Sequence, residues 1–418
     1  MPTDTQKPWE QSLGQFLEEV VSRNPDKTFI EIGGLSRTYQ EFYDGVRKSA
    51  AMFAVLGIEK GDRVCLFLPN CIEYVYSWFG LSLIGAIAVP VNTAYKRDEM
   101  AYILNNAEAK GLVTDPSLAG VAGAAADLAS CVKVRLLRGA EGSSPDGWTD
   151  FGEAHVAAVA LESPPEISPH DISMLVYTSG TTGNPKGVYF SQRQLVVHTL
   201  ALAAAAASPA EQGRFHAGDV YMPITPMFHV HAWGFPYVAT LLGVKQVYPG
   251  RYEPGRLLRL IADEGVTFSH CVPTILHMLL GDPLASEVDL SRWKVVIGGS
   301  ALPEALAQRA LDLGIDIFGG YGMSETCPVL TLAQLRPTDD ERSAEKLLAR
   351  RCKAGRPVPL VGLRVVDTDG CDQPRDGDSS GEVVVRAPWL TQGYLDDPEL
   401  SEALWQDGYL HTGDIGHV

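Results

Sequence analysis

The segment Met174-Leu-Val-Tyr-Thr-Ser-Gly-Thr-Thr-Gly-Asn-Pro-Lys-Gly187 joins a short apolar run to a loop that is dense in hydrogen-bond donors. We expect Met174–Thr178 to be a strand, and Thr178–Gly187 contains three glycines, three threonines, a serine and a lysine. Glycines permit backbone conformations that turn N–H groups inward, and the hydroxyls add further donors. Lys186 supplies a positive charge for a phosphate oxygen. The composition predicts a phosphate cradle at the end of a strand, against the alternative of an ordinary turn.

This loop differs from the phosphate loop of P-loop kinases and GTPases. That pattern requires Gly-Lys followed by Ser or Thr after four intervening residues. Here Pro185 precedes Lys186 and Gly187 follows it, so a P-loop kinase or GTPase is a poor match.

Helical and strand patterns alternate on both sides of the loop, which predicts an α/β fold with largely parallel sheets. The 418 residues exceed what one hydrophobic core usually supports, so several units are expected. We predict two stacked α/β units and a small β-rich, distorted barrel-like unit, over residues 1–170, 171–354 and 355–418. The patterns that carry this prediction are helices at Leu13–Arg23, Tyr39–Leu56 and Leu195–Ala207, and strands at Phe29–Ile32, Arg63–Leu68, Ile87–Asn92, Val220–Ile224, Thr267–Cys271, Val295–Ile297, Ile315–Phe318, Leu363–Asp367 and Gly381–Arg386.

Composition and charge narrow the classes of partner. The formal net charge of -17 argues against a nucleic-acid or anionic-membrane partner, because both would be repelled at long range. The seven cysteines are scattered without a CxxC pair, which is typical of free thiols in a reducing compartment. The apolar stretch from Tyr74 to Val89 is short and interrupted by glycines and serines, so we expect a buried helix there. With no signal peptide recognised at the N-terminus, the expected location is the cytoplasm.

Four further motifs follow the loop: Pro226-Met-Phe-His-Val-His-Ala-Trp-Gly234, Gly320-Tyr-Gly-Met-Ser-Glu-Thr326, Gly381–Arg386 with Gly393-Tyr394, and His411-Thr-Gly-Asp414. In this order they resemble the signatures of the AMP-forming adenylating enzymes, which include acyl-CoA synthetases, luciferases and peptide-synthetase adenylation domains. The run Phe228-His-Val-His-Ala-Trp233 is most similar to bacterial medium- and long-chain fatty acyl-CoA synthetases. The resemblance implies that a carboxylic acid reacts with ATP to give an acyl-adenylate and pyrophosphate, and that CoA then accepts the acyl group.

The resemblance also implies roles for single residues. Lys186, Glu325 and His229 are the expected catalytic residues, with Glu325 as the ligand of Mg²⁺, a cation that prefers carboxylate oxygens. Ser324 stands where the family usually has Thr, and its hydroxyl is expected to hold the α-phosphate, while Asp414 is expected to bind the ribose. The expected ATP- or AMP-binding residues are Thr178, Ser179, Gly180, Thr181, Thr182, Lys186, Gly299, Ser300, Ala301, Gly320, Tyr321, Gly322, Met323, Ser324 and Asp414.

An acyl pocket is expected beside the nucleotide. Its expected residues are His229, Trp233, Gly234, Thr274, Gly298 and Gly322. For His229 and His231 a metal site is the alternative, but no third ligand is evident nearby in the sequence. Trp233 is expected to gate a fatty-acid tunnel, with ordinary core packing as the alternative. For Gly298–Ala301 the alternative is a plain strand–helix turn.

Several alternatives stay open from the sequence. The family carries a mobile C-terminal domain after the Thr-Gly-Asp motif, and the chain ends four residues after Asp414, so we expect slow adenylation and very little thioester formation. The acid can be linear, aromatic or polycyclic, and a carrier protein can replace CoA as acceptor. The remaining alternative is that the protein is a non-catalytic nucleotide-binding module. We also expect a homodimer, no nucleic-acid partner and no stable membrane insertion.

Overall fold

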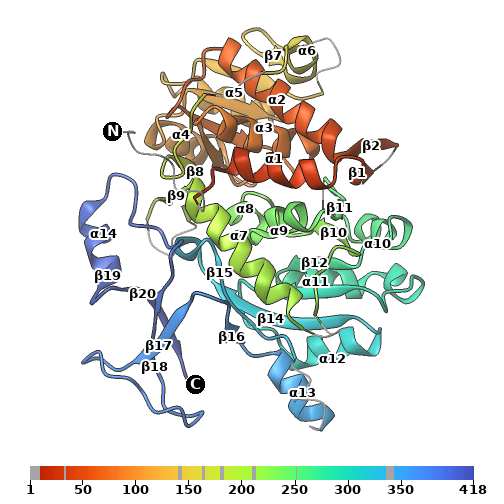
Figure 1. Ribbon diagram of the computed structural model, residues 1–418, viewed down its shortest axis with the longest axis vertical. Coiled ribbons are helices and arrows are strands. Elements are labelled where there is room, and N and C mark those ends of the chain that lie inside the picture. The colour runs from red at the N-terminus through yellow and green to blue at the C-terminus, as the bar shows by residue number, and fades with distance from the viewer. Residues whose placement is uncertain are drawn as a thin grey trace.

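The computed structural model describes residues 10–32, 34–139, 144–161, 165–178, 183–209, 213–250, 252–335 and 343–418. Two large sheets, each with helices packed on it, lie one above the other, and a small sheet lies beside the lower one (Figure 1). The C-terminus lies in the small sheet. The predicted α/β fold with two mostly parallel sheets and a small β-rich unit is confirmed.

The upper sheet has seven strands. All neighbouring pairs are parallel except β8 and β9, which form an antiparallel pair at one edge. In spatial order the strands are β7 (Thr149–Asp150), β6 (Val134–Leu137), β5 (Gly111–Thr114), β3 (Arg63–Phe67), β4 (Ile87–Pro90), β8 (Ile172–Thr178) and β9 (Lys186–Ser191). Its helices are α2 (Tyr39–Val55), α3 (Ile72–Leu83), α4 (Arg97–Asn106), α5 (Ala119–Ala126) and α6 (Phe151–Ala157), while α1 (Leu13–Arg23) packs on α2 and α3.

The lower sheet has nine strands and carries the chemistry-bearing loops. In spatial order they are β16 (Arg356–Pro357), β15 (Val329–Leu332), β14 (Asp316–Gly322), β13 (Lys294–Ile297), β12 (Phe268–Cys271), β10 (Val220–Pro223), β11 (Lys245–Gln246), β1 (Thr28–Ile32) and β2 (Leu35–Thr38). The central strands from β14 to β1 are parallel, and the edges are antiparallel. Its helical segments are α7 (Gln192–Ala207), α8 (Val230–Trp233), α9 (Phe235–Leu242), α10 (Pro254–Asp263), α11 (Pro273–Gly281), η1 (Pro283–Ser286), α12 (Glu304–Asp312), η2 (Ser324–Thr326) and α13 (Ala344–Arg351).

The small sheet is antiparallel and closes the lower left of the molecule (Figure 1). Its strands, in spatial order, are β17 (Gly362–Val366), β18 (Gly381–Arg386), β20 (Tyr409–Gly416) and β19 (Trp405–Gln406), and α14 (Pro398–Leu404) leads into β19. Val365, Val383 and Val385 are buried and Leu410 packs with them, so this sheet joins the main hydrophobic core.

Local sequence explains where the first helices begin. At the start of α1 the Ser12 hydroxyl accepts a hydrogen bond from the backbone N–H of Gln15, and the Gln15 side chain accepts one from the backbone N–H of Ser12. Thr38 and Glu41 make the same pair of hydrogen bonds at the start of α2. The stretch Tyr74–Val89, in which a buried helix was predicted, contains most of α3, whose residues from Tyr74 to Leu83 are all buried, and it ends in strand β4. No helix in the described part of the chain has both the length and the apolar character needed to cross a membrane.

The sheets do not follow the predicted boundary at residue 170. β1 and β2 come from the first 170 residues yet form the edge of the lower sheet, and β8 and β9 lie beyond that boundary yet complete the upper one. Hydrophobic patterns mark strands but do not reveal which distant strand each one pairs with. The division into three separate domains, over residues 1–170, 171–354 and 355–418, therefore remains a prediction.

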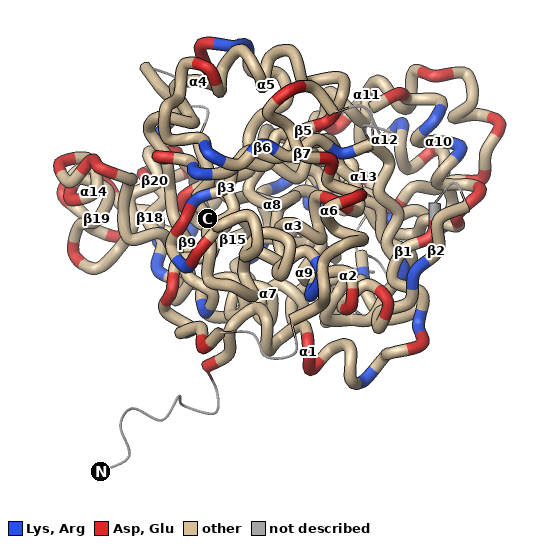
Figure 2. Tube along the Cα trace, turned by 90° about the horizontal axis from the view of Figure 1, so that it is seen from above, with Lys and Arg blue, Asp and Glu red and all other residues tan. Residues whose placement is uncertain are grey.

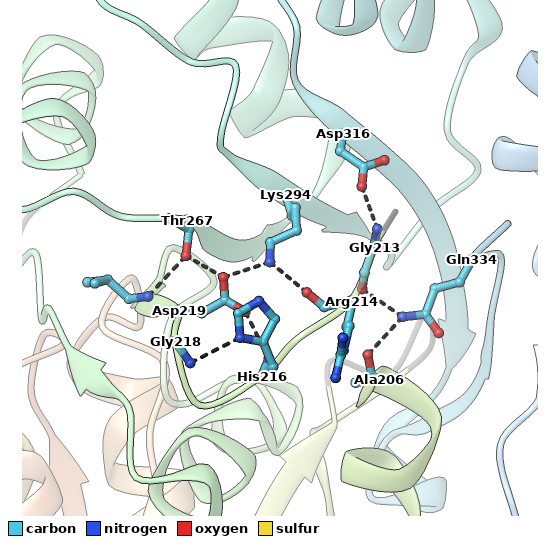
Figure 3. Close-up of polar contacts among 11 residues, drawn as sticks. Ala206, Gly213, Arg214, His216, Gly218, Asp219, Thr267, Lys294, Asp316 and Gln334 are labelled. Atoms are coloured by element: carbon cyan, nitrogen blue, oxygen red, sulfur yellow. Dashed lines mark hydrogen bonds and ion pairs between the residues drawn. The ribbon is translucent and has the colours of Figure 1, made fainter. Parts of the chain in front are cut away.

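A buried polar network ties together the amino ends of the central strands (Figure 3). The Asp219 carboxylate accepts from the Lys294 Nζ and from the Thr267 hydroxyl, each at 2.6 Å, at the starts of β10, β13 and β12. Asp316 at the start of β14 pairs with Arg351 at 2.6 Å. The opposite, carboxyl ends of these strands are left for the ligand-bearing loops.

Acidic and basic residues are interspersed along the chain trace (Figure 2). The acidic residues are densest around α14, where few basic residues lie among them.

Candidate adenylation site

A cavity of about 630 Å³ lies at the carboxyl ends of the central strands of the lower sheet. This edge is where open α/β sheets bind their ligands, because the strand–helix loops meet there. Twelve of the predicted residues line it: Thr178, His229, Trp233, Gly298, Gly299, Gly320, Tyr321, Gly322, Met323, Ser324, Glu325 and Asp414. The structure thus brings together residues from four motifs that are far apart in the sequence.

The remaining predicted residues fall into two groups. Ser179, Gly180, Thr181 and Thr182 lie outside the described residues. Among the residues that the structure does describe, Lys186, Gly234, Thr274, Ser300 and Ala301 do not line this cavity. Thr274 is exposed near the start of α11. Gly234 is buried against the His198 ring and caps α9 with a φ of 76° that favours glycine, so its place reflects backbone conformation.

Two glycines allow close packing on the face of the sheet. A Cβ atom at Gly298 would lie 3.1 Å from the Trp233 ring, and one at Gly320 would lie 3.2 Å from side-chain carbons of Leu332 and Val296. The two glycines therefore let these apolar side chains pack closer to the strand backbone than a Cβ atom would allow. Trp233, Val296 and Leu332 make this part of the cavity apolar.

Glu325, Tyr394 and Lys186 form a charged cluster beside the cavity. The Tyr394 hydroxyl donates to Oε1 of Glu325 at 2.8 Å, and the Lys186 Nζ lies 5.3 Å from the centre of the Tyr394 ring. Burial and the Glu325 carboxylate raise the pKa of Tyr394, so this hydroxyl stays protonated and can donate. The backbone N–H of Leu395 donates to the Gly187 carbonyl at 2.7 Å, which fixes this segment against β9. A carboxylate and an ammonium group thus lie on one side of the site.

Tyr321 and Asp414, which both line the cavity, are joined by a hydrogen bond. The Tyr321 hydroxyl donates to Oδ2 of Asp414 at 2.7 Å, which links the end of β14 to β20. Burial is the main cause that raises the pKa of Tyr321, and hydrogen bonding with Asp414 adds to it. Asp414 is exposed, so its carboxylate remains open to a ligand hydroxyl.

His229 begins a left-handed turn that shapes the cavity wall. Val230, His231, Ala232 and Trp233 have φ values between 40° and 59°, a region that costs a non-glycine residue about 1–2 kcal/mol. The turn directs Trp233 onto Gly298 and holds His229 at the wall. His229 is accessible from the cavity, yet protein atoms surround it closely enough to lower the pKa of its imidazole. It is therefore neutral at neutral pH.

A buried polar network supports this wall from below. The ring of His270 lies 5.0 Å from that of Trp233, and its nitrogens contact the Thr225 hydroxyl at 3.0 Å and the Tyr221 hydroxyl at 2.7 Å. Burial lowers the pKa of His270 to about 3, so its imidazole is neutral. Thr225 lines the cavity, so this network reaches the ligand space directly.

Asn70 holds the segment that leads to His229. Its side-chain Nδ2 donates to the carbonyls of Pro223 and Thr225 at 2.9 and 3.2 Å, and its Oδ1 accepts from the Met227 N–H at 2.8 Å. Asn70 follows β3 in the upper sheet, so one buried side chain fixes a lower-sheet loop to the upper sheet. We did not predict this role, because a single Asn after a strand has no distinguishing pattern.

Sequence reasoning also missed several cavity residues. They are Thr225, Val296, Pro328, Val329 and Leu332. Val230 and Thr412 also line the cavity, but they lie inside two of the motifs, and Val272 lies two residues before the predicted Thr274. Thr225 directly precedes the motif that begins at Pro226, so its proximity was a usable signal. Val296 and Leu332 read as ordinary strand residues, and only the pairing of β13, β14 and β15 reveals that they face the cavity.

Residues 17–395 match the AMP-binding enzyme family. The chain belongs to this family. It is 37% identical to the long-chain-fatty-acid–CoA ligase of Thermus thermophilus, with 97% of this chain and 74% of that protein covered. It is 33% identical to the 3-[(3aS,4S,7aS)-7a-methyl-1,5-dioxo-octahydro-1H-inden-4-yl]propanoyl:CoA ligase of Mycobacterium tuberculosis, with 96% of this chain and 76% of that protein covered.

Solved structures agree with the family assignment. The inhibitor-bound N-terminal domain of FACL13 from Mycobacterium tuberculosis superimposes with a TM-score of 0.84 at 27% identity, covering 98% of this chain and 97% of that one. The relatives are named as CoA ligases, and this AMP-binding protein is an enzyme of the same acid–thiol ligase class.

Proposed function

We propose that this enzyme joins a hydrophobic carboxylic acid to CoA by way of an acyl-adenylate. The observation that carries the proposal is one cavity with two chemically distinct walls. Tyr321, Ser324, Glu325 and Asp414 supply polar groups at its rim, whereas Trp233, Val296 and Leu332 supply an apolar floor. A nucleotide fits the first set and an acyl chain fits the second.

In the first step a carboxylate oxygen of the acid attacks the α-phosphorus of ATP. The bond from that phosphorus to the oxygen bridging to the β-phosphate breaks, and pyrophosphate leaves. We assign Ser324 to donate to the α-phosphate, Asp414 to accept from the ribose hydroxyls and Tyr321 to pack against adenine. Lys186 and the loop residues Ser179, Gly180, Thr181 and Thr182 are assigned to the β- and γ-phosphates. Holding two anions together is the main catalytic task here.

In the second step the sulfur of CoA attacks the acyl carbon and AMP leaves, with the thiol proton passing to solvent. His229 is assigned to the wall near the reacting carboxyl group. It also lines a narrow space with Phe228, Asn92 and Tyr95 next to the main cavity. Because His229 is neutral, it adds no positive charge that would trap the leaving AMP.

Mg²⁺ fits the residues present. In the described part of the chain no three His, Cys, Asp or Glu side chains gather into a metal-binding group. Mg²⁺ needs no such cage, since it is commonly held by one or two carboxylates together with substrate phosphates. Glu325 would be that carboxylate, oriented by Tyr394. When bound, the ion would neutralise charge on the phosphates.

The acid class follows from the apolar floor and from the relatives. The Thermus relative is named for long-chain fatty acids and the Mycobacterium relative for a fused-ring propanoic acid, and both acids are large and hydrophobic. We therefore assign a fatty acid as the first choice and a polycyclic acid as the second. A cytoplasmic location and a homodimer are parts of the same proposal, and size-exclusion chromatography with light scattering tests the dimer.

An ATP–pyrophosphate exchange assay over acids of increasing length tests the proposal. We expect exchange with fatty acids, and Glu325→Gln should reduce it about 100-fold at fixed Mg²⁺ because a ligand of the ion is weakened. Glu399→Gln, which alters an exposed glutamate on α14, is the matched control. No exchange with any acid would favour a non-catalytic nucleotide-binding module. Exchange with benzoates alone would favour an aryl-CoA ligase.

A further inference from the structure

His231 occupies an aromatic slot inside the core. Its side chain is fully buried. The centre of its ring lies 5.8 Å from that of Trp78 on α3, 5.5 Å from that of Tyr237 on α9 and 6.3 Å from that of Phe190 on β9. The strand β9 is the edge of the upper sheet and α3 packs on that sheet, whereas α9 belongs to the lower one. His231 therefore anchors the left-handed turn Val230–Trp233 where the two large sheets meet.

The turn needs an anchor of this kind. Four consecutive non-glycine residues in the left-handed region together cost roughly 4–8 kcal/mol. The backbone offsets little of this, since the Trp233 N–H donates to the His229 carbonyl at the long distance of 3.4 Å. Val230 and Trp233 line the cavity, and Ala232 has only a methyl group. His231 is thus the long side chain that ties the turn to the core.

The His231 ring also contacts the loop that carries Glu325. Its Nε2 lies 3.8 Å from the Sγ of Cys327, a hydrogen-bonding distance for sulfur. Cys327 directly follows η2 and has a φ of 74°, so it too lies in the left-handed region. Burial lowers the pKa of the imidazole well below its usual value and raises the pKa of the thiol well above its own. The contact is therefore a neutral thiol–imidazole pair between two strained segments.

Packing alone does not explain a histidine at this position. The Nδ1 of His231 has no hydrogen-bond partner among the residues that the structure describes. A buried polar atom in this situation costs about 1–3 kcal/mol, and such exceptions call for an explanation. A phenylalanine ring would fill the aromatic slot without that cost. What the imidazole adds is the contact of Nε2 with Cys327, and hence a link to the Glu325 loop.

We propose that His231 is a positioning residue of the adenylation site, which fixes the turn beginning at His229 relative to the Glu325 loop through its contact with Cys327. The inference rests on the proposed function, in which His229 lies beside the carboxyl group of the acid and Glu325 lies on the phosphate side. In-line attack requires that these two sides keep their spacing, because a displacement of about 1 Å can lower a rate about 100-fold. His231 touches neither reactant and acts through the two segments.

His231→Phe tests this role, because it keeps a ring in the slot and removes the contact with Cys327. In ATP–pyrophosphate exchange with dodecanoate, kcat should fall about tenfold while the KM for ATP stays within twofold, since the reactants still bind but are misaligned. The free energy of unfolding, measured in urea, should stay the same or rise because the unpaired Nδ1 is gone. A purely structural histidine predicts the reverse, namely lower stability with an unchanged kcat.

Cys327→Ala removes the other side of the same contact and should lower kcat by a similar factor. The double variant His231→Phe/Cys327→Ala should then lower kcat no further than the more severe single change, because both substitutions delete one interaction. Effects that multiply in the double variant would overturn the inference. A kcat for His231→Phe within twofold of the wild type would do the same.

Tyr74→Phe is the matched control. The Tyr74 hydroxyl is also buried without a hydrogen-bond partner in the described part of the chain, and its ring belongs to the same hydrophobic core as Trp78 and Tyr237. Because Tyr74 does not line the adenylation cavity, losing this hydroxyl should leave kcat within twofold. A wild type that exchanges no acid of any length would instead overturn the proposed function, and this inference with it.

Discussion

Asn70 shows how one buried amide can support a site that it does not touch. Its side chain is 2% exposed and fixes three backbone groups between Pro223 and Met227, just before His229. The Gly250 N–H also donates to its backbone carbonyl at 3.0 Å. Because these bonds join the two large sheets, the position of the His229 wall depends on how the sheets pack.

Replacing Asn70 should therefore affect both stability and acid binding. Asn70→Ala leaves the buried Met227 N–H and two carbonyls without their partner, so the free energy of unfolding should fall by about 3 kcal/mol. Among molecules that remain folded, the KM for the acid should rise more than the KM for ATP, because the displaced loop lines the acyl side. Urea unfolding and exchange kinetics measure the two effects.

Asn105→Ala is the matched control for this change. The Asn105 amide also donates to two backbone carbonyls, those of Ala101 and Leu128, but it is exposed and does not line the main cavity. Equal rises in both KM values for Asn70→Ala would show that its role is only general stability.

At the scale of strands, the two ends of the lower sheet have separate tasks. The carboxyl ends carry the cavity, while the Asp219–Lys294–Thr267 network holds the amino ends of β10, β12 and β13. The Asp219 side chain is 4% exposed, so its charge depends on Lys294 for compensation. Removing one partner of a buried ion pair leaves the other charge unpaired.

Asp219→Asn should lower the free energy of unfolding by about 3 kcal/mol. The exchange rate per folded molecule should change little, since the altered residue lies at the other end of the strands. Asp127→Asn is the control. The Asp127 side chain is 70% exposed in its ion pair with Arg135, and exposed pairs of this kind contribute about 0.5 kcal/mol to the free energy of unfolding. A large loss of exchange activity at unchanged stability would contradict the separation of the two ends.

At the scale of the whole molecule, buried histidines should make the fold sensitive to acid. Burial lowers the pKa of His198 and of His270 to about 3, and it lowers that of His231 well below its usual value. In the unfolded chain these groups take up protons below about pH 6.5, whereas the folded protein keeps them neutral. Stability should therefore be full above pH 6.5 and should fall as the pH decreases.

Each of these buried histidines should lower the free energy of unfolding by about 2 kcal/mol as the pH falls from 6.5 to 5. Urea unfolding at pH 7.5 and pH 5 measures the loss. His270→Gln should reduce the difference between the two pH values, whereas His277→Gln, at an exposed position on α11, should not. The same stability at both pH values in the wild type would contradict the assignment of neutral buried imidazoles.

Local patterns were enough to predict the α/β class and the helix Leu13–Arg23 with its bounds. These two features depend on short-range periodicity and capping, which a linear sequence displays. The motif residues that meet in the cavity were named from the resemblance to a family. Only the folded chain revealed the partners of β1, β2, β8 and β9 and the roles of Asn70 and Tyr394. Each depends on contacts between residues far apart in the sequence, and such contacts are selected by packing and burial of the entire core rather than by any local pattern.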